Sequence, residues 1–133
     1  MVDHQPRRKD LLHPELSYRI IGVLFDVYNV LGPGHRELYY QRAVAEALKK
    51  ESLPFQEQVR FPLRYHEKLV GSYFLDFLID NKIILELKRG NRYSKRHIDQ
   101  VLEYLRASKH DLAILASFGA DGVTFKRIVA FGK

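Results

Sequence analysis

The spacing of apolar residues first predicts two helices. From Pro14 the apolar positions recur at steps of three and four residues, and Gly32-Pro33-Gly34 interrupts this pattern. That is the expected behaviour of an amphipathic helix that ends at a turn. A second helical pattern runs from about Arg36 to Glu51. The expected buried positions are Leu16, Ile20, Leu24, Val27 and Leu31 in the first helix, and Leu38, Val44, Ala45 and Leu48 in the second.

Strand patterns begin after Pro54. Apolar and polar residues alternate from Val59 to Tyr65, and Pro62 within this run favours the edge of a sheet. Two later segments, 70–79 and 82–88, are apolar on both faces. Such segments are typical of strands at the centre of a sheet, where both faces are covered.

The remaining pattern completes the order of the elements. Ser94 is a suitable N-cap for a helix to about Ser108 with Ile98, Val101, Leu102 and Leu105 on its buried side, and strands are expected at 112–117 and 123–130. The resulting order is α-α-β-β-β-α-β-β. It predicts an α/β sandwich in which helices flank a central mixed sheet.

Composition narrows the class of protein. A chain of 133 residues predicts one domain, here 13–133, preceded by a loose basic segment at 1–12. The absence of cysteine excludes disulfides, thiolate zinc sites and iron–sulfur clusters. No apolar run reaches the roughly 20 residues that span a bilayer, and no signal-type apolar core follows the basic N-terminus. We therefore expect a cytoplasmic protein, whose net charge of +6 favours a polyanionic partner.

Two carboxylates stand in segments that otherwise consist of core residues. Asp76 lies within 70–79, and Glu86 lies within 82–88 with Lys88 two residues later. Residues two apart on a strand point to the same face. An uncompensated buried carboxylate costs several kcal/mol, so its charge must be balanced. A divalent cation would do so, although Glu and Lys two apart can also be a simple surface ion pair.

The length of the turn between these strands decides whether the two acids meet. A two-residue turn at Asp80-Asn81 would send Glu86 to the opposite face from Asp76. A three-residue loop that includes Lys82 places Asp76 directly across from Glu86, so we predict an odd-length loop or a β-bulge. Mg²⁺ or Mn²⁺ would then take oxygens from both carboxylates and from the carbonyl of Leu87. Lys88 would orient the attacking water or stabilise charge developing on a phosphate.

Other residues extend this candidate site. Glu37 and Tyr40 are three apart in the second helix, and Gln100 and Tyr104 are four apart in the third, so each pair shares a helix face. Glu37 can alternatively be a dipole-stabilising residue of a first helical turn, and the Gln–Tyr pair a boundary of the core. Basic residues that would suit phosphate contacts cluster nearby, unless they are only a solvated loop and helix start: Lys88, Arg89, Arg92, Lys95 and Arg96.

These motifs resemble a known family. Gly34-His35-Arg36-Glu37-Leu38-Tyr39-Tyr40 is similar to the signature of the small GxxExxY proteins, which are assigned to the PD-(D/E)XK nuclease superfamily. Asp76 matches the superfamily's strand aspartate, and Glu86-Leu87-Lys88 its (D/E)-x-K motif. The stretch from Gln100 to Tyr104 resembles the Gln-x-x-x-Tyr element of RecB-type and λ-exonuclease-like nucleases, and Leu75 replaces the common proline.

The resemblance implies a Mg²⁺- or Mn²⁺-dependent deoxyribonuclease, with RNA as an alternative substrate. Glu37, Asp76, Glu86 and the Leu87 carbonyl would bind metal, and Lys88 would position water. Gln100, Tyr104 and Tyr40 would hold the substrate. Two other classes remain open. One is a non-cleaving nucleic-acid-binding module or partner subunit, and the other is a hydrolase of a smaller phosphate ester. The oligomeric state is not indicated by the sequence.

Overall fold

The computed structural model describes residues 12–91 and 93–130, and the elements follow the predicted order. The predicted basic segment 1–12 lies outside the described residues except for Leu12. The helices are α2 (Pro14–Leu31), α3 (Glu37–Lys50) and α4 (Lys95–Ser108). The strands are β1 (Phe55–Tyr65), β2 (Lys68–Ile79), β3 (Ile83–Arg89), β4 (Leu112–Phe118) and β5 (Val123–Val129).

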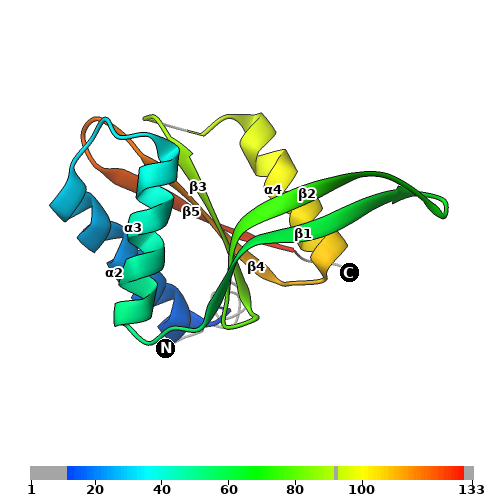
Figure 1. Ribbon diagram of the computed structural model, residues 1–133, viewed down its shortest axis with the longest axis horizontal. Helices are drawn as coiled ribbons and strands as arrows, with labels where there is room; N and C mark the ends of the chain where they lie inside the picture. Colours follow the sequence, from blue (N-terminus) through cyan, green and yellow to red (C-terminus); the bar gives the residue numbers. More distant parts are fainter. Residues whose placement is uncertain (1–11, 92, 131–133) are drawn as a thin grey trace, which may run out of the picture.

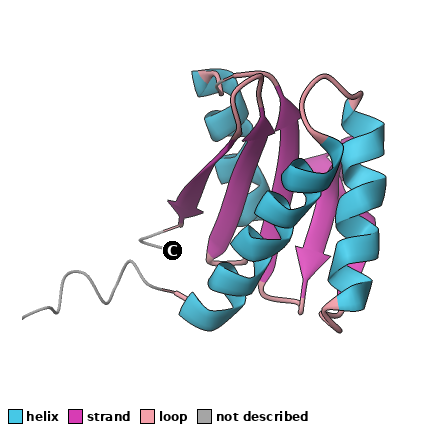
Figure 2. Cartoon of the chain, turned by 90° about the vertical axis from the view of Figure 1, so that its left-hand side faces the viewer, coloured by secondary structure: helices cyan, strands magenta, loops and turns pink. Residues whose placement is uncertain are grey.

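The five strands form one mixed sheet in the order β1-β2-β3-β4-β5. Only β3 and β4 pair in parallel, because α4 connects them as a crossover, and the other neighbours are antiparallel. Helices α2 and α3 cover one face of the sheet and α4 covers the other (Figures 1 and 2). The expected α/β sandwich is therefore confirmed, as is the position of β1 at an edge.

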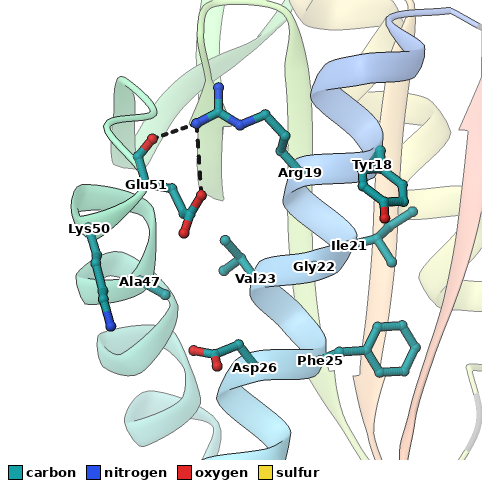
Figure 3. Close-up of a pocket in the computed structure, with 10 residues that line it drawn as sticks. All are labelled: Tyr18, Arg19, Ile21, Gly22, Val23, Phe25, Asp26, Ala47, Lys50 and Glu51. Atoms are coloured by element: carbon teal, nitrogen blue, oxygen red, sulfur yellow. Dashed lines mark hydrogen bonds and ion pairs between the residues drawn. The ribbon is translucent and has the colours of Figure 1, made fainter.

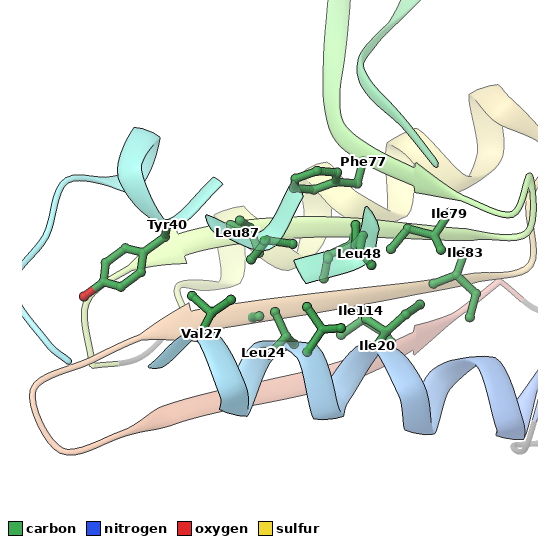
Figure 4. Packing of buried hydrophobic residues seen from close by; sticks show 14 of the residues in the cluster. Ile20, Leu24, Val27, Tyr40, Leu48, Phe77, Ile79, Ile83, Leu87 and Ile114 are labelled. Carbon is green, nitrogen blue, oxygen red and sulfur yellow. The ribbon is translucent and has the colours of Figure 1, made fainter. Parts of the chain in front are cut away.

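The main core lies between the sheet and the pair α2 and α3 (Figure 4). Ile20, Leu24 and Val27 project from α2 toward the sheet, as the apolar spacing predicted. The prediction for α3 was wrong at one position, because Leu38 is 41% exposed. Its place is taken by Tyr40, which shares one helix face with other residues four and eight positions later, Val44 and Leu48.

The hairpin of β1 and β2 has two different halves. Near the turn to β3, Phe77 and Ile79 pack in the core of α2 and α3. Further out, Val59 and Leu75 belong to the second core, beneath α4. Strict alternation would place Leu75 on the same side as Phe77, so the strands turn over between these residues. We call residues 59–75 the outer hairpin, which projects beyond the body of the protein (Figure 1).

The turnover coincides with a break in the ladder between β1 and β2. Regular pairs run through Glu57↔Phe77 and resume at Val59↔Leu75, without a pair between Gln58 and Asp76. Gln58 has a left-handed backbone with φ of 50°, which is unusual for a strand residue. The expectation of a fully covered second strand was therefore wrong for its outer part, where side chains such as Val70 and Phe74 are exposed.

Membrane-spanning character is absent from the helices that the structure describes. Within 12–91 and 93–130, none is both long and apolar enough to cross a bilayer.

Candidate active site

The register of β2 and β3 brings the two candidate acids together. Phe77 pairs with Leu85 and Ile79 with Ile83, which leaves a three-residue loop between the strands. This confirms the predicted odd-length loop. Continuing the register by one residue places Asp76 opposite Glu86, at the point where regular pairing between the strands stops.

Each carboxylate takes over a hydrogen bond that strand backbone would otherwise make. The amide of Asp76 donates to Oε2 of Glu86 at 2.8 Å, and the amide of Leu87 donates to Oδ2 of Asp76 at 2.8 Å. The side chains thus bridge β2 and β3 where the two strands begin to separate. The second oxygen of Asp76 accepts a weaker bond of 3.4 Å from Nε2 of Gln58. Glu86 is only 3% exposed.

Burial and mutual repulsion disfavour the charged forms of the acids. Burial, together with the charge of Asp76, raises the pKa of Glu86 to about 8. Burial also raises the pKa of Asp76, although the Leu87 amide and the Lys88 charge oppose this. A pair of like charges that is protected from water is costly unless a cation joins it. A cation bound beside the pair would reduce this cost.

Glu37 and Lys88 join the same electrostatic cluster. Burial raises the pKa of Glu37, while the charge of Lys88 lowers it and that of Asp76 raises it. A backbone hydrogen bond from Arg89 holds the Glu37 carboxylate at the end of β3. The positive charge of Lys88 lowers the pKa of all three acids, as expected for a cation beside them. The first turn of α3 and the end of β3 thus bring together residues far apart in the chain.

The acids are not already arranged as a metal cage. Within the described part of the chain, no three histidine, aspartate or glutamate side chains form a group that could hold a metal ion. Oδ2 of Asp76 and Oε2 of Glu86 are instead engaged by backbone amides. Their other oxygens and the Glu37 carboxylate remain the donor set that a cation would use.

Tyr40 does not take the position expected of a substrate-binding residue. Its side chain is fully buried and stacks on Phe118 with ring centroids 4.3 Å apart. Its hydroxyl donates to the Gly32 carbonyl at 2.6 Å and accepts from the His35 amide at 3.3 Å. Tyr40 therefore anchors the loop that leads into α3. Through this loop it supports the placement of Glu37, one helical turn earlier.

Helix α4 presents Tyr104 to the carboxylates. The pKa of Tyr104 is raised by burial first and then by the charges of Glu86 and Asp76. Its ring also meets Tyr73 of the outer hairpin at 5.1 Å in an edge-to-face contact. Gln100 lies one turn earlier on α4 and is half-buried. The predicted Gln–Tyr pair thus lies on the helix that covers the acids.

The start of α4 confirms the predicted cap. Ser94 Oγ accepts from the His97 amide at 3.2 Å, and the Ser94 amide donates to His97 Nδ1 at 3.3 Å. This reciprocal pair is a capping box. Burial, followed by the charges of Lys88 and Arg96, lowers the pKa of His97.

The described residues of the predicted basic segment differ in whether an acid already pairs with them. Arg89 and Arg96 are exposed, whereas Lys95 pairs with Asp99 at 2.9 Å within α4. Arg92 lies outside the described residues.

Sequence reasoning missed two supporting features. Gln58 contacts Asp76, but a glutamine in an alternating strand resembles any surface residue. Gly119 is the second: a Cβ there would come within 2.6 Å of the Asn91 side chain and 2.9 Å of the Gly90 carbonyl. Only glycine fits this close approach, which holds the loop after β3 against the end of β4. The glycine itself was visible in the sequence, but its neighbours were not.

A cavity of about 560 Å³ lies elsewhere, between α2 and α3 (Figure 3). Its lining is largely apolar, and Arg19 is paired with Glu51 at its edge. Asp26 is a further acid there, but no second carboxylate faces it across a strand ladder. The cavity therefore lacks the paired carboxylates that Asp76 and Glu86 provide between β2 and β3.

Comparison with known proteins identifies the family and the fold. A family model described as the PD-(D/E)XK nuclease superfamily matches residues 14–128. A solved structure described as "Crystal structure of SSO0001" has a similar fold, with a TM-score of 0.57 and 19% sequence identity. The similarity covers 96% of this chain but only 63% of that one. No curated protein matches.

Proposed function

This chain belongs to the PD-(D/E)XK nuclease superfamily, and from that premise we propose that it hydrolyses phosphodiester bonds of DNA with the help of Mg²⁺ or Mn²⁺. One observation carries the proposal. Asp76 and Glu86 lie opposite one another between β2 and β3, and the charges of Glu37 and Lys88 influence the same pair. Such a constellation is costly to fold unless a cation completes it.

The donor set fits a hard divalent cation. Asp76, Glu86 and Glu37 supply carboxylate oxygens, and the carbonyl of Leu87 would complete the protein ligands. All three carboxylates have pKa values raised by burial, a condition that a bound cation relieves. When bound, such a cation lowers the pKa of coordinated water and neutralises charge on a phosphate.

The chain's own residues would divide the remaining tasks. Lys88 holds the attacking water or stabilises charge on the phosphate, since its ammonium acts on the carboxylate cluster. Gln100 and Tyr104 would position the substrate from α4. The exposed Arg89 and Arg96, with Lys95 and Arg92, would attract the phosphate backbone. We place this reaction in the cytoplasm, on single- or double-stranded DNA.

A cleavage assay tests the proposal. Labelled single- and double-stranded DNA, with RNA in parallel, is incubated with Mg²⁺, Mn²⁺ or EDTA. Wild type should cleave DNA only with metal, and Lys88→Ala should cleave at least about 100-fold more slowly, as expected when a transition-state contact is lost. Lys50→Ala, which removes an exposed lysine on α3, is the matched control and should cleave normally. Equal cleavage by both variants would refute the role of Lys88.

A second candidate function is a nucleic-acid-binding module or partner subunit that does not cleave. The exposed Arg89 and Arg96 support it, because basic side chains on the surface suit phosphate contacts. Such a protein would bind DNA in a salt-sensitive manner without metal-dependent products. Glu86→Gln separates the two functions, because a nuclease would lose turnover and a binding module would be little changed.

A further inference from the structure

The outer hairpin carries positive charge that nothing in the described structure neutralises. Between residues 59 and 75 stand Arg60, Arg64 and Lys68, against a single acid, Glu67. Within the described ranges these three basic residues form no ion pair, whereas basic residues on the helices do, including Lys95 with Asp99 and Arg106 with Glu103. Uncompensated charge on an exposed element is available to a polyanion.

The face of the outer hairpin that points away from α4 combines charge with an aromatic ring. Arg60 pairs across the strands with Phe74, which is 51% exposed. The neighbouring pair, Val59 and Leu75, faces the core beneath α4, so alternation turns Arg60 and Phe74 outward. Arg64, four residues beyond Arg60, is also exposed and follows a register shift between Leu63 and Arg64. Arginine beside an exposed aromatic suits phosphate contact together with base contact.

The outer hairpin starts at the candidate active site. Asp76 is the residue at which β2 leaves the main sheet, and Tyr73 contacts Tyr104 beside the acids. Arg60 lies opposite Phe74, two residues from Asp76, and Arg64 lies opposite Leu69, seven residues away. At about 3.3 Å per strand residue these are reaches of about 7 and 23 Å. Along the axis of a B-form duplex, at about 3.4 Å per base pair, they correspond to about two and seven base pairs.

We propose that the outer hairpin is a second contact surface for the nucleic-acid backbone, in which Arg60 and Arg64 bind phosphates that lie beyond the scissile bond. The inference rests on the proposed function, because it takes the candidate site at Asp76 and Glu86 as the place of cleavage. Both single strands and duplexes offer this phosphate chemistry, and a two-stranded ribbon has the dimensions to enter a duplex major groove. Oligonucleotides of the two kinds therefore distinguish the sources.

The test is binding without turnover, measured as fluorescence anisotropy of labelled oligonucleotides in EDTA. The double variant Arg60→Ala/Arg64→Ala should weaken binding of oligonucleotides of about 24 nucleotides roughly tenfold, and lower the slope of log affinity against log salt by nearly two. The control Lys50→Ala/Lys126→Ala removes the same charge from α3 and from β5, the other edge of the sheet, and should have little effect. Arg60→Lys/Arg64→Lys should retain most of the affinity, because the charge remains.

The length of the oligonucleotide provides an internal check. Duplexes of about 6 base pairs extend only about 20 Å, which is too short to reach both arginines from Asp76 and Glu86, so the alanine variant should lose less affinity for them. Equal loss at both lengths, or equal binding by the alanine variant and the control, would overturn the inference. If sedimentation showed that the alanine variant abolishes self-association and that this accounts for the lost affinity, the surface would be a protein interface, which also overturns it.

The cleavage assay keeps this inference separate from the proposed function. A wild type that cleaves DNA, with an arginine variant that binds and cleaves normally, would refute the contact by the outer hairpin and leave the nuclease intact. A wild type that neither cleaves nor binds nucleic acid would refute both.

Discussion

The inner and outer halves of β2 belong to one strand but have opposite surroundings. Phe77 is fully buried beneath α2 and α3, whereas Phe74, three residues earlier, is 51% exposed. Asp76 stands between them, where pairing with β3 ends. A strand can therefore hold a buried carboxylate at the point where it leaves the sheet. There, backbone amides that have lost their ladder partners are available to the acid.

The largest expected effect contrasts the two phenylalanines. Phe77→Ala should lower the free energy of unfolding by about 3–5 kcal/mol, because it empties a filled core site. Phe74→Ala should change it by about 0.5 kcal/mol or less, as is usual for exposed positions. Urea denaturation of both variants measures the difference. Similar losses would mean that the outer hairpin is packed as tightly as the inner half.

The next effect concerns the charge at the boundary. Glu86→Gln keeps an oxygen for the Asp76 amide but removes an acid whose ionisation the fold opposes, because burial and the charge of Asp76 raise its pKa to about 8. In EDTA the variant should be more stable than wild type by about 2 kcal/mol. Added Mg²⁺ should stabilise wild type more than the variant, since the ligand binds the folded form.

Thermal unfolding with EDTA and with Mg²⁺ checks both parts of this expectation. Glu46→Gln, at an exposed position of α3, is the matched control and should match wild type both in EDTA and in its response to Mg²⁺. A destabilised Glu86→Gln variant would show that the ionised acid is needed to hold the strands together.

The turnover of the hairpin can be tested at Gln58. Its left-handed backbone is disfavoured for a β-branched residue, so Gln58→Val should destabilise the fold by about 1–2 kcal/mol. Gln56→Val, in the regular part of β1, should be neutral or slightly stabilising, because valine favours strands. Denaturant titration of the pair decides the point. Equal stability of the two variants would argue against a special conformation at Gln58.

The smallest expected effect concerns the start of α4. This helix covers the core in which Val59 and Leu75 of the outer hairpin pack. Ser94→Ala removes the cap to the His97 amide and should cost about 0.5–1 kcal/mol at neutral pH. The pKa of His97 is lowered in the fold, so the unfolded chain binds its proton more readily. This contribution to stability is present above the ordinary histidine pKa of about 6.5 and is lost as pH falls through the lower folded value.

The pH dependence of unfolding checks this sign. Wild type should lose more stability on acidification than His97→Gln, a variant that retains a capping side chain without a proton to gain. Parallel pH curves for the two proteins would show that the cap does not titrate.

Apolar periodicity and turn residues predicted the order of the elements and most of their bounds. These are properties of neighbouring residues, which the local chain largely determines. The three-residue loop was inferred from the requirement that Asp76 and Glu86 share a face, because a one-residue change of register reverses every side chain of a strand. The cap at Ser94 was predictable for the same local reason.

Other features depend on contacts between distant parts of the chain. The burial of Tyr40 depends on Phe118 and on the loop at Gly32, which no periodicity in α3 reveals. The turnover at Gln58 brings Val59 and Leu75 under α4, so it requires both the twist of the hairpin and a helix that follows later in the chain. Local pattern in the sequence was therefore enough to identify the residues proposed for the site. The approach of Glu37 and Lys88 to it, and the surface beside it, depend on tertiary packing, because they follow from the assembly of elements rather than from the elements themselves.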